Sequence, residues 1–321
     1  LIVTASYMGT TVATNFPMLA ACFVLKGFGS CLIGSTSLNF LVDNWFRKGS
    51  GTVLGIAMSL TGIVTAVFSP IFSSLIESRG WQFAMIVMGF ISILFCLPLA
   101  AIKVTPEEKG LRAYGAEESA EPVQPVAVTT EELPLVKDFT YYVLIVVMFM
   151  ATVSFCMVHH VATYASSIGL SATTGALLVS TTMIGNMVFK LLMGFLCDKI
   201  NPLRTSIISF ALATLAFFLF LVAFQIPQLV FLAASIFGVI FFNSTLAVGQ
   251  IIKMLYDRAL FTRIYAVILF TSSIANVIFG TLTGYMYDWF GTYFPAMCIF
   301  FLFSLIATVL LIMLNNRQKA V

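Results

Sequence analysis

Long apolar segments alternate with short polar turns along most of the chain. A transmembrane helix needs about 20 apolar residues, because it rises about 1.5 Å per residue through a hydrocarbon core of about 30 Å. Ten segments follow this pattern, although the first is short, and we expect each to be a helical span. They cover residues 1–16, 17–42, 51–76, 82–102, 139–166, 172–197, 205–224, 228–252, 264–286 and 294–314.

Residues 103–137 interrupt the apolar pattern. This stretch holds four prolines, seven glutamates and few aromatic residues, which is typical of a solvated linker. The sequence therefore predicts an N-terminal helical bundle at 1–103, a linker at 104–137 and a six-helix bundle at 138–321.

Composition supports an all-α membrane protein. The chain is 60% apolar and 9% charged, with a mean hydropathy of +1.05, whereas soluble domains carry about 25% charged residues. The six cysteines lie in or at the ends of apolar runs without CxxC spacing, so we interpret them as buried hydrophobic residues. The sequence shows no phosphate loop, zinc-ligand spacing or nucleophile triad. We expect no cofactor, metal site, enzymatic activity or nucleic-acid partner.

Basic residues indicate an orientation. If the linker is cytoplasmic, thirteen of the sixteen Lys and Arg residues fall on the same side, which is a strong positive-inside pattern. We expect a multi-pass protein of the plasma or cytoplasmic membrane, with the linker and the C-terminus in the cytoplasm. Arg79 falls on the other side, and Lys26 and Lys190 lie within spans.

Lys190 and Lys26 are the candidate substrate-binding cations. A charge inside a bilayer costs roughly 2.5–3.5 kcal/mol on insertion scales and marks a functional site by default. Lys190 lies eight residues before Asp198, roughly 12 Å from the boundary, and no acid lies inside any expected span. Two unpaired cations at similar depth predict a small organic anion as substrate. For Lys26, snorkelling or pairing with an acid outside this sequence stays open.

Polar residues at helical spacing extend this candidate site. Asn186 and Gly194 share the face of Lys190, and Asn243 and Asn276 lie on further polar stripes, where they could line a cavity or bond between helices. His159 and His160 are candidates for proton coupling, since imidazole titrates near neutral pH, or are exposed residues at the outer mouth. Gly51-x-x-x-Gly55 and Gly280-x-x-x-Gly284 predict close helix contacts.

The two halves of the sequence show weak similarity at an offset of 211 residues. Arg47, Glu77 and Gly80 match Arg258, Asp288 and Gly291. Two repeats joined by a linker are a common transporter plan. Because the second half has six spans, we expect two further spans to precede Leu1, so that about ten of twelve are present.

Three motifs resemble the major facilitator superfamily. Residues 194–201, Gly-Phe-Leu-Cys-Asp-Lys-Ile-Asn, are similar to its Gly-x-Leu-x-Asp-(Arg/Lys)-x-Gly loop, with Asn201 in place of the last glycine. Residues 45–49 with 55–57 and 80–81, and residues 284–293, resemble the oxalate/formate antiporter and monocarboxylate transporter branch. The resemblance implies a two-bundle transporter, a monomer in the lipid bilayer, with a cytoplasmic gating loop that includes Gly194, Asp198, Lys199 and Arg204.

The resemblance also implies a role for Lys190. In that branch a cation in span eight, usually Arg, meets the substrate carboxylate, and Lys190 occupies the matching position. The expected function is secondary transport of a mono- or dicarboxylate, as an antiporter or a proton symporter. A drug- or sugar-type transporter and a transport-inactive sensor or scaffold on the same fold are the alternatives. A membrane-embedded enzyme is disfavoured, since no intramembrane acids, histidines or cysteines cluster for chemistry.

Overall fold

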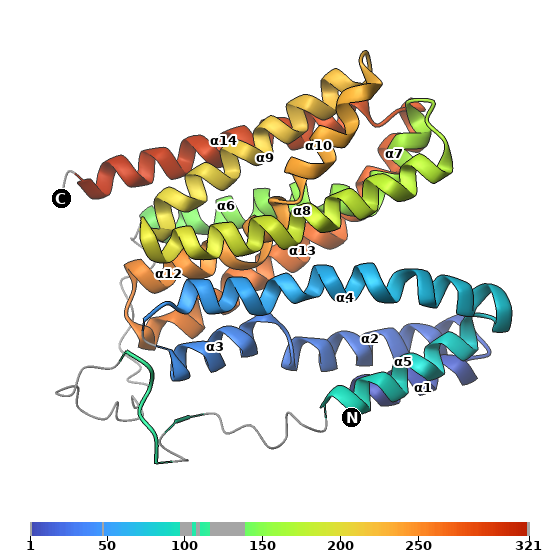
Figure 1. Ribbon diagram of the computed structural model, residues 1–321, viewed down its shortest axis with the longest axis horizontal. Helices are drawn as coiled ribbons and strands as arrows, with labels where there is room; N and C mark the ends of the chain where they lie inside the picture. The colour runs from blue at the N-terminus through green and yellow to red at the C-terminus, as the bar shows by residue number, and fades with distance from the viewer. Residues whose placement is uncertain (1, 47, 97–104, 107–109, 116–138, 320–321) are drawn as a thin grey trace. The chain divides into compact units, whose positions relative to one another are not determined.

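The computed structural model describes residues 2–46, 48–96, 105–106, 110–115 and 139–319, and helices dominate them (Figure 1). Within these described residues, seven helical segments are long and apolar enough to cross a membrane: Phe16–Trp45, Phe139–Ser167, Thr173–Lys199, Pro202–Ala223, Pro227–Leu255, Arg263–Phe290 and Phe294–Gln318. The expected all-α membrane fold is therefore confirmed. Most of the expected linker at 104–137 lies outside the described residues.

The chain forms two compact units. The first comprises residues 1–50 and 64–120, and the second comprises 51–63 and 121–321. Helix α4 (Ser50–Arg79) contributes to both, because residues 51–63 pack with the second unit. The expected bundles at 1–103 and 138–321 remain a prediction.

The first unit is built from α1 (Ile2–Val12), α2 (Phe16–Leu32), α3 (Ser35–Trp45), the second part of α4, and α5 (Trp81–Cys96). Helix α1 packs against both α2 and α5. Helix α2 starts where the Asn15 side chain accepts a hydrogen bond from the Met18 amide, as N-cap residues do. The expected span at 17–42 is thus two helices, because the backbone leaves helical geometry at Gly34.

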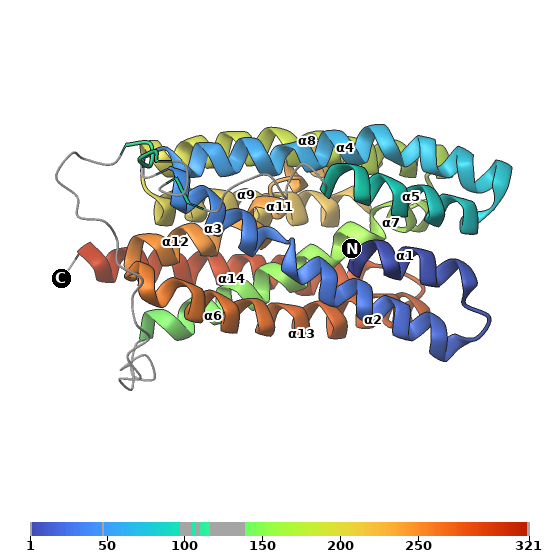
Figure 2. The same ribbon diagram turned by 90° about the horizontal axis from the view of Figure 1, so that it is seen from below.

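The second unit holds the remaining helices. They are α6 (Phe139–Phe155), α7 (Val161–Ser167), α8 (Ala172–Lys199), α9 (Pro202–Ala223), α10 (Val230–Phe237), α11 (Ile240–Phe242), α12 (Val248–Leu255), α13 (Arg258–Phe290) and α14 (Phe294–Lys319). Helix α14 packs on α9 and α6, α13 packs on α6, and α10 packs on α8 and α9 (Figures 1 and 2).

Two of the expected continuous spans in this unit are interrupted. The span at 139–166 contains a 3-10 turn at Cys156–His160 between α6 and α7. The span at 228–252 contains a turn at Gly238 and a π-helical stretch at Asn243–Ala247. Mid-helix 3-10 and π stretches are frequent at functional sites, and apolar periodicity alone does not reveal them.

Aromatic side chains fill the core of the second unit. Phe217, Phe220 and Phe237 are fully buried and meet edge to face, the geometry that aromatic pairs favour. The buried Tyr164 hydroxyl donates a 2.6 Å hydrogen bond to the Phe220 carbonyl. This bond ties α7 to α9 and gives the phenol a partner inside an apolar core.

The backbones of α8 and of the segment formed by α10 and Gly238 are in direct contact where they cross. A Cβ atom on Gly238 would lie 2.3 Å from the Asn186 backbone nitrogen, and one on Gly185 would lie 2.2 Å from the Ser235 carbonyl oxygen. Only glycine on both sides permits this approach. The crossing places Asn186 in the interior, one turn before Lys190 on α8.

We predict that Gly238→Ala destabilises the protein, because its methyl group would meet backbone atoms that cannot rotate away. Overpacking of this kind costs about 1–3 kcal/mol. The apparent Tm of the detergent-solubilised protein should fall by several degrees. Gly284→Ala is the control, because a Cβ there has no described atom within 4 Å. Equal Tm values for the two variants would contradict the crossing.

Candidate functional site

Lys190 lies in the C-terminal half of α8 with only 3% of its surface exposed. Its Nζ atom lies 3.5 Å from the Met58 carbonyl oxygen and 3.4 Å from Thr61 Oγ1 on α4. The Phe241 ring lies 5.6 Å from the same atom, within cation–π range. Among the residues that the structure describes, Lys190 has no carboxylate partner. The ammonium is held only by neutral groups.

Glycines bring the two helices this close. A Cβ on Gly55 would lie 2.7 Å from the Lys190 carbonyl oxygen, and one on Gly194 would lie 2.6 Å from the Gly51 carbonyl oxygen. The close contact predicted for Gly51 and Gly55 is confirmed. The one predicted at Gly280 and Gly284 is not made in the described structure, because added Cβ atoms there would meet at most Asn276 Oδ1 at 3.8 Å.

Asp198 joins the end of α8 to the start of α4. Its carboxylate accepts hydrogen bonds from the Gly51 amide at 3.0 Å and from the Thr52 amide. These amides lie in the first turn of α4, whose N–H groups have no helical partner and attract negative charge. Within the expected gating loop, Gly194 and Asp198 thus contact α4, while Lys199 and Arg204 are exposed.

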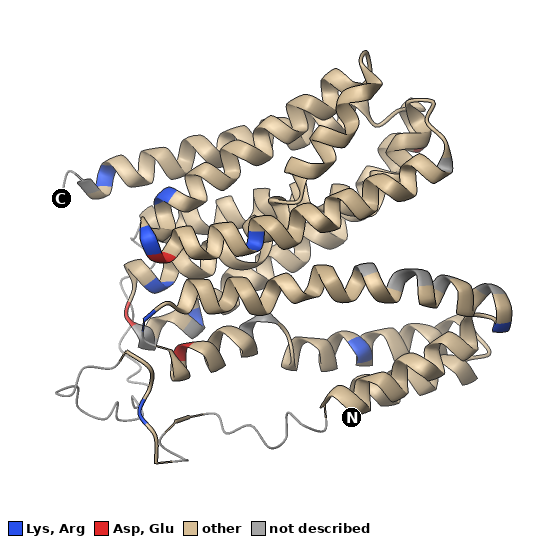
Figure 3. Ribbon diagram, in the orientation of Figure 1, with Lys and Arg blue, Asp and Glu red and all other residues tan. Residues whose placement is uncertain are grey.

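Basic side chains gather at this end of the second unit. Figure 3 shows Lys and Arg where α8 meets α9 and where α14 ends. Lys199 lies over the Phe195 ring at 5.8 Å, and Arg317 lies over the Phe139 ring at 5.0 Å. Cations stacked on aromatic rings at helix ends suit the boundary between membrane and water.

Asn186 and Asn243 each bury an oxygen without a partner. The Asn186 and Asn243 Oδ1 atoms have no hydrogen bond in the described structure, although the residues are 2% and 0% exposed. The Asn243 amide nitrogen donates to the Ser209 carbonyl oxygen on α9 at 3.3 Å. Buried polar atoms normally have partners, so both oxygens have capacity for a further donor such as water or substrate.

Asn276 lies elsewhere on the second unit. It is an exposed residue of α13, and its Oδ1 lies 3.6 Å from the Cys156 sulfur at the break between α6 and α7. The contacts recorded for Asn276 and Asn243 thus run to Cys156 and α9 rather than to Lys190. Their substrate-binding roles remain predictions.

His160 belongs to a polar cluster at the opposite end of the unit. Its Nδ1 lies 3.2 Å from the Tyr293 hydroxyl, which lies 2.9 Å from Thr163 Oγ1. Burial raises the pKa of the Tyr293 phenol, so this hydroxyl stays protonated near neutral pH. His159 is exposed, with its ring against Phe155. Of the two histidines, His160 therefore has the defined hydrogen-bond partner.

Lys26 lies in the first unit, on α2, and is half-buried. Its Nζ atom lies 4.6 Å from the Tyr7 ring and 5.7 Å from the Phe23 ring. Like Lys190, it has no ion pair within the described portion of the chain. Its predicted role in substrate binding remains a prediction.

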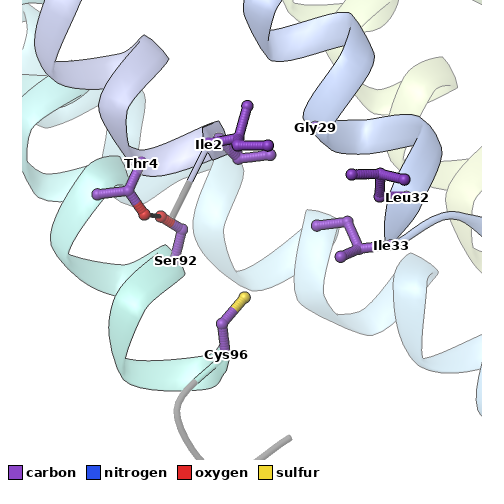
Figure 4. A pocket seen from close by; sticks show the side chains of 8 residues that line it. Ile2, Thr4, Gly29, Leu32, Ile33, Ser92 and Cys96 are labelled. Carbon is purple, nitrogen blue, oxygen red and sulfur yellow. Dashed lines mark hydrogen bonds between the residues drawn. The ribbon is translucent and has the colours of Figure 1, made fainter. Parts of the chain in front are cut away.

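An apolar pocket of about 350 Å³ also lies in the first unit, between α1, α2 and α5 (Figure 4). The Thr4 and Ser92 hydroxyls meet across one wall at 2.8 Å. No charged side chain is among its lining residues: Ile2, Val3, Thr4, Gly29, Leu32, Ile33, Ser92 and Cys96. The pocket therefore does not compete with Lys190 as a site for an anion.

Several neighbours of the candidate residues were not predicted from the sequence. Thr61 and Phe241 meet Lys190, and Tyr293 meets His160, although each is distant from its partner in the chain. A lone threonine in an apolar run, or one of 32 phenylalanines, carries no signal of its own. Within the described regions, no group of three or more His, Cys, Asp and Glu residues is placed to hold a metal ion.

The apolar helices, long enough to span a bilayer, define a polytopic helical membrane protein. A family model described as "Major Facilitator Superfamily" matches residues 1–175 and 143–321. The chain therefore belongs to the major facilitator superfamily, as its motifs predict.

Curated relatives and solved structures agree with this family. The chain is 26% identical over 199 residues to human monocarboxylate transporter 12, covering 55% of this chain and 38% of that protein. Its match to monocarboxylate transporter 12 of Xenopus laevis is 38% identical over 72 residues, 22% of this chain and 15% of that protein. The chain thus spans less than half the length of these relatives.

The E. coli fucose:proton symporter has the same fold, with a TM-score of 0.70 at 12% identity, covering 97% of this chain and 80% of that one. A second structure, of a superfamily transporter in the outward conformation, gives a TM-score of 0.70 at 13% identity with the same coverage. At this identity the likeness concerns the fold alone.

We predict that Asp198→Ala loosens the start of α4, because two amide groups lose their acceptor. Loss of an N-terminal cap costs about 0.5–2 kcal/mol. A cysteine placed at Thr52 should react faster with a water-soluble maleimide in the Asp198→Ala background. Lys199→Ala, which removes an exposed neighbour, is the control. Unchanged labelling in Asp198→Ala would contradict the capping contact.

Proposed function

We propose that this protein is a secondary transporter that moves a small organic anion, a mono- or dicarboxylate, by alternating access. One observation carries the proposal: the Lys190 ammonium is buried in a spanning helix with only neutral partners in the described structure. Such a site favours a carboxylate, since two opposite full charges attract strongly where water is scarce. The relatives named monocarboxylate transporter support the same substrate class.

Asn186 is the proposed second contact for this anion. It lies one helical turn before Lys190 on the same face of α8, and both side chains are buried. An amide can accept from a hydroxyl and donate to a carboxylate. We also propose that the protein acts as a monomer, as its resemblance to the family implies.

The basic end of the second unit is the proposed cytoplasmic end. Lys199 ends α8, Arg204 lies in the first turn of α9, and Arg317 lies in the last turn of α14, which agrees with the positive-inside pattern of the sequence. In this orientation the C-terminus faces the cytoplasm of a cell whose plasma or cytoplasmic membrane holds the protein. The contact of Asp198 with α4 then holds the cytoplasmic end together and must open during transport.

We predict that Lys190→Met abolishes uptake of the anion while the protein still inserts, because the substrate carboxylate loses its charged partner. Uptake of radiolabelled short mono- and dicarboxylates, from acetate to succinate, into proteoliposomes measures the effect. Arg317→Met removes an exposed cation at the end of α14 and is the control, with uptake like the parent. Parental uptake by Lys190→Met would contradict the site.

Proton coupling through His160 would give uptake a dependence on pH. If His160 carries the coupled proton, His160→Asn should have similar uptake rates at pH 5 and pH 8, whereas the parent should be faster at pH 5, where more of the imidazole binds a proton. The exposed His159 provides the comparison, and His159→Asn should keep the parental pH profile. A parental profile in His160→Asn would show that His160 does not carry the coupled proton.

A further inference from the structure

Two oxygen atoms on α4 contact the Lys190 ammonium. The Met58 carbonyl and the Thr61 hydroxyl lie 3.5 Å and 3.4 Å from Nζ, and the Thr61 hydroxyl itself donates a 2.6 Å hydrogen bond to the Met58 carbonyl. The two oxygens therefore form one preformed unit. Both carry partial negative charge, and neither carries a full charge.

These contacts are long for hydrogen bonds. Bonds between an ammonium and an oxygen are usually about 2.7–3.2 Å, and those to a carboxylate are about 2.7–2.9 Å. The Met58–Thr61 pair therefore holds the cation loosely, and a carboxylate would displace it. Thr61 is exposed whereas Lys190 is buried, so the hydroxyl marks the accessible edge of this contact.

We propose that Thr61 is a positioning residue whose hydroxyl, with the Met58 carbonyl, takes the place of the substrate carboxylate when no anion is bound. This inference rests on the proposed function. An unloaded carrier must reorient with a positive charge in its interior, and an unpartnered buried charge opposes this step. A neutral placeholder on α4 lowers that barrier, which allows net transport as well as exchange.

The placeholder acts only in the empty carrier. When an anion is bound, its carboxylate pairs with the Lys190 ammonium, and the Thr61 hydroxyl keeps its hydrogen bond to the Met58 carbonyl. Removing the hydroxyl should therefore slow the return of the empty carrier and leave the loaded step unchanged. A residue that merely packs α4 against α8 would affect both steps alike.

The test compares net uptake with exchange for Thr61→Val, which keeps the shape, and Thr61→Ser, which keeps the hydroxyl. The full-length protein in proteoliposomes is assayed with whichever carboxylate, from acetate to succinate, the parent takes up. Thr61→Val should lower net uptake into empty vesicles by about five- to tenfold, the value of one ordinary hydrogen bond. Exchange into preloaded vesicles should stay within about twofold, and Thr61→Ser should restore both.

The other outcomes separate the two proposals. Equal loss of net uptake and exchange in Thr61→Val, or no loss in either, overturns the placeholder while Lys190→Met still abolishes transport. Uptake that survives in Lys190→Met, or no carboxylate uptake by the parent, overturns the proposed function instead. Thr61→Ala is assayed in parallel, so that poor insertion of the valine variant does not decide the result.

Discussion

A single buried cation constrains how the second unit is arranged. An apolar helix with an ammonium near its middle is unfavourable in a bilayer unless oxygen atoms or an aromatic face surround the charge. Here the Met58 carbonyl, the Thr61 hydroxyl and the Phe241 ring do so. They come from helices far apart in sequence, so the charge is accommodated only when α4 and α11 are both in place beside α8. The free-energy cost of burying this ammonium therefore favours the arrangement in which these helices surround it.

The contact between α4 and α8 follows from a regular spacing on α8. Lys190, Gly194 and Asp198 are four residues apart, so they lie on one helical face. Each has a different task there: Lys190 points its charge at α4, Gly194 allows backbone contact, and Asp198 accepts from the first amides of α4. Along α4 the partners run in the opposite order, as expected for antiparallel helices. The polar contacts at both ends and the glycine between them define one continuous seam.

Sequence reasoning found what local chemistry determines. The apolar periodicity predicted the helices, and the pair Gly51 and Gly55 predicted a close contact, because small residues are the condition for backbone approach. The same pattern at Gly280 and Gly284 has no such contact, since small residues permit an approach without specifying a partner. The breaks at Cys156–His160 and Asn243–Ala247 were also missed. They depend on packing between helices, which a pattern along one helix does not contain.

If Lys190 binds the transported anion, as we propose, its neutral surroundings affect how strongly it does so. A carboxylate of the protein beside the ammonium would form a strong pair that a substrate would have to break, so binding would gain little. With oxygens that carry no net charge at 3.4–3.5 Å, the ammonium keeps most of its attraction for an anion. The interaction must still be strong enough for the empty site to be tolerated in the membrane interior. Partners of intermediate strength satisfy both conditions, and a threonine hydroxyl bonded to a backbone carbonyl of its own helix is such a partner.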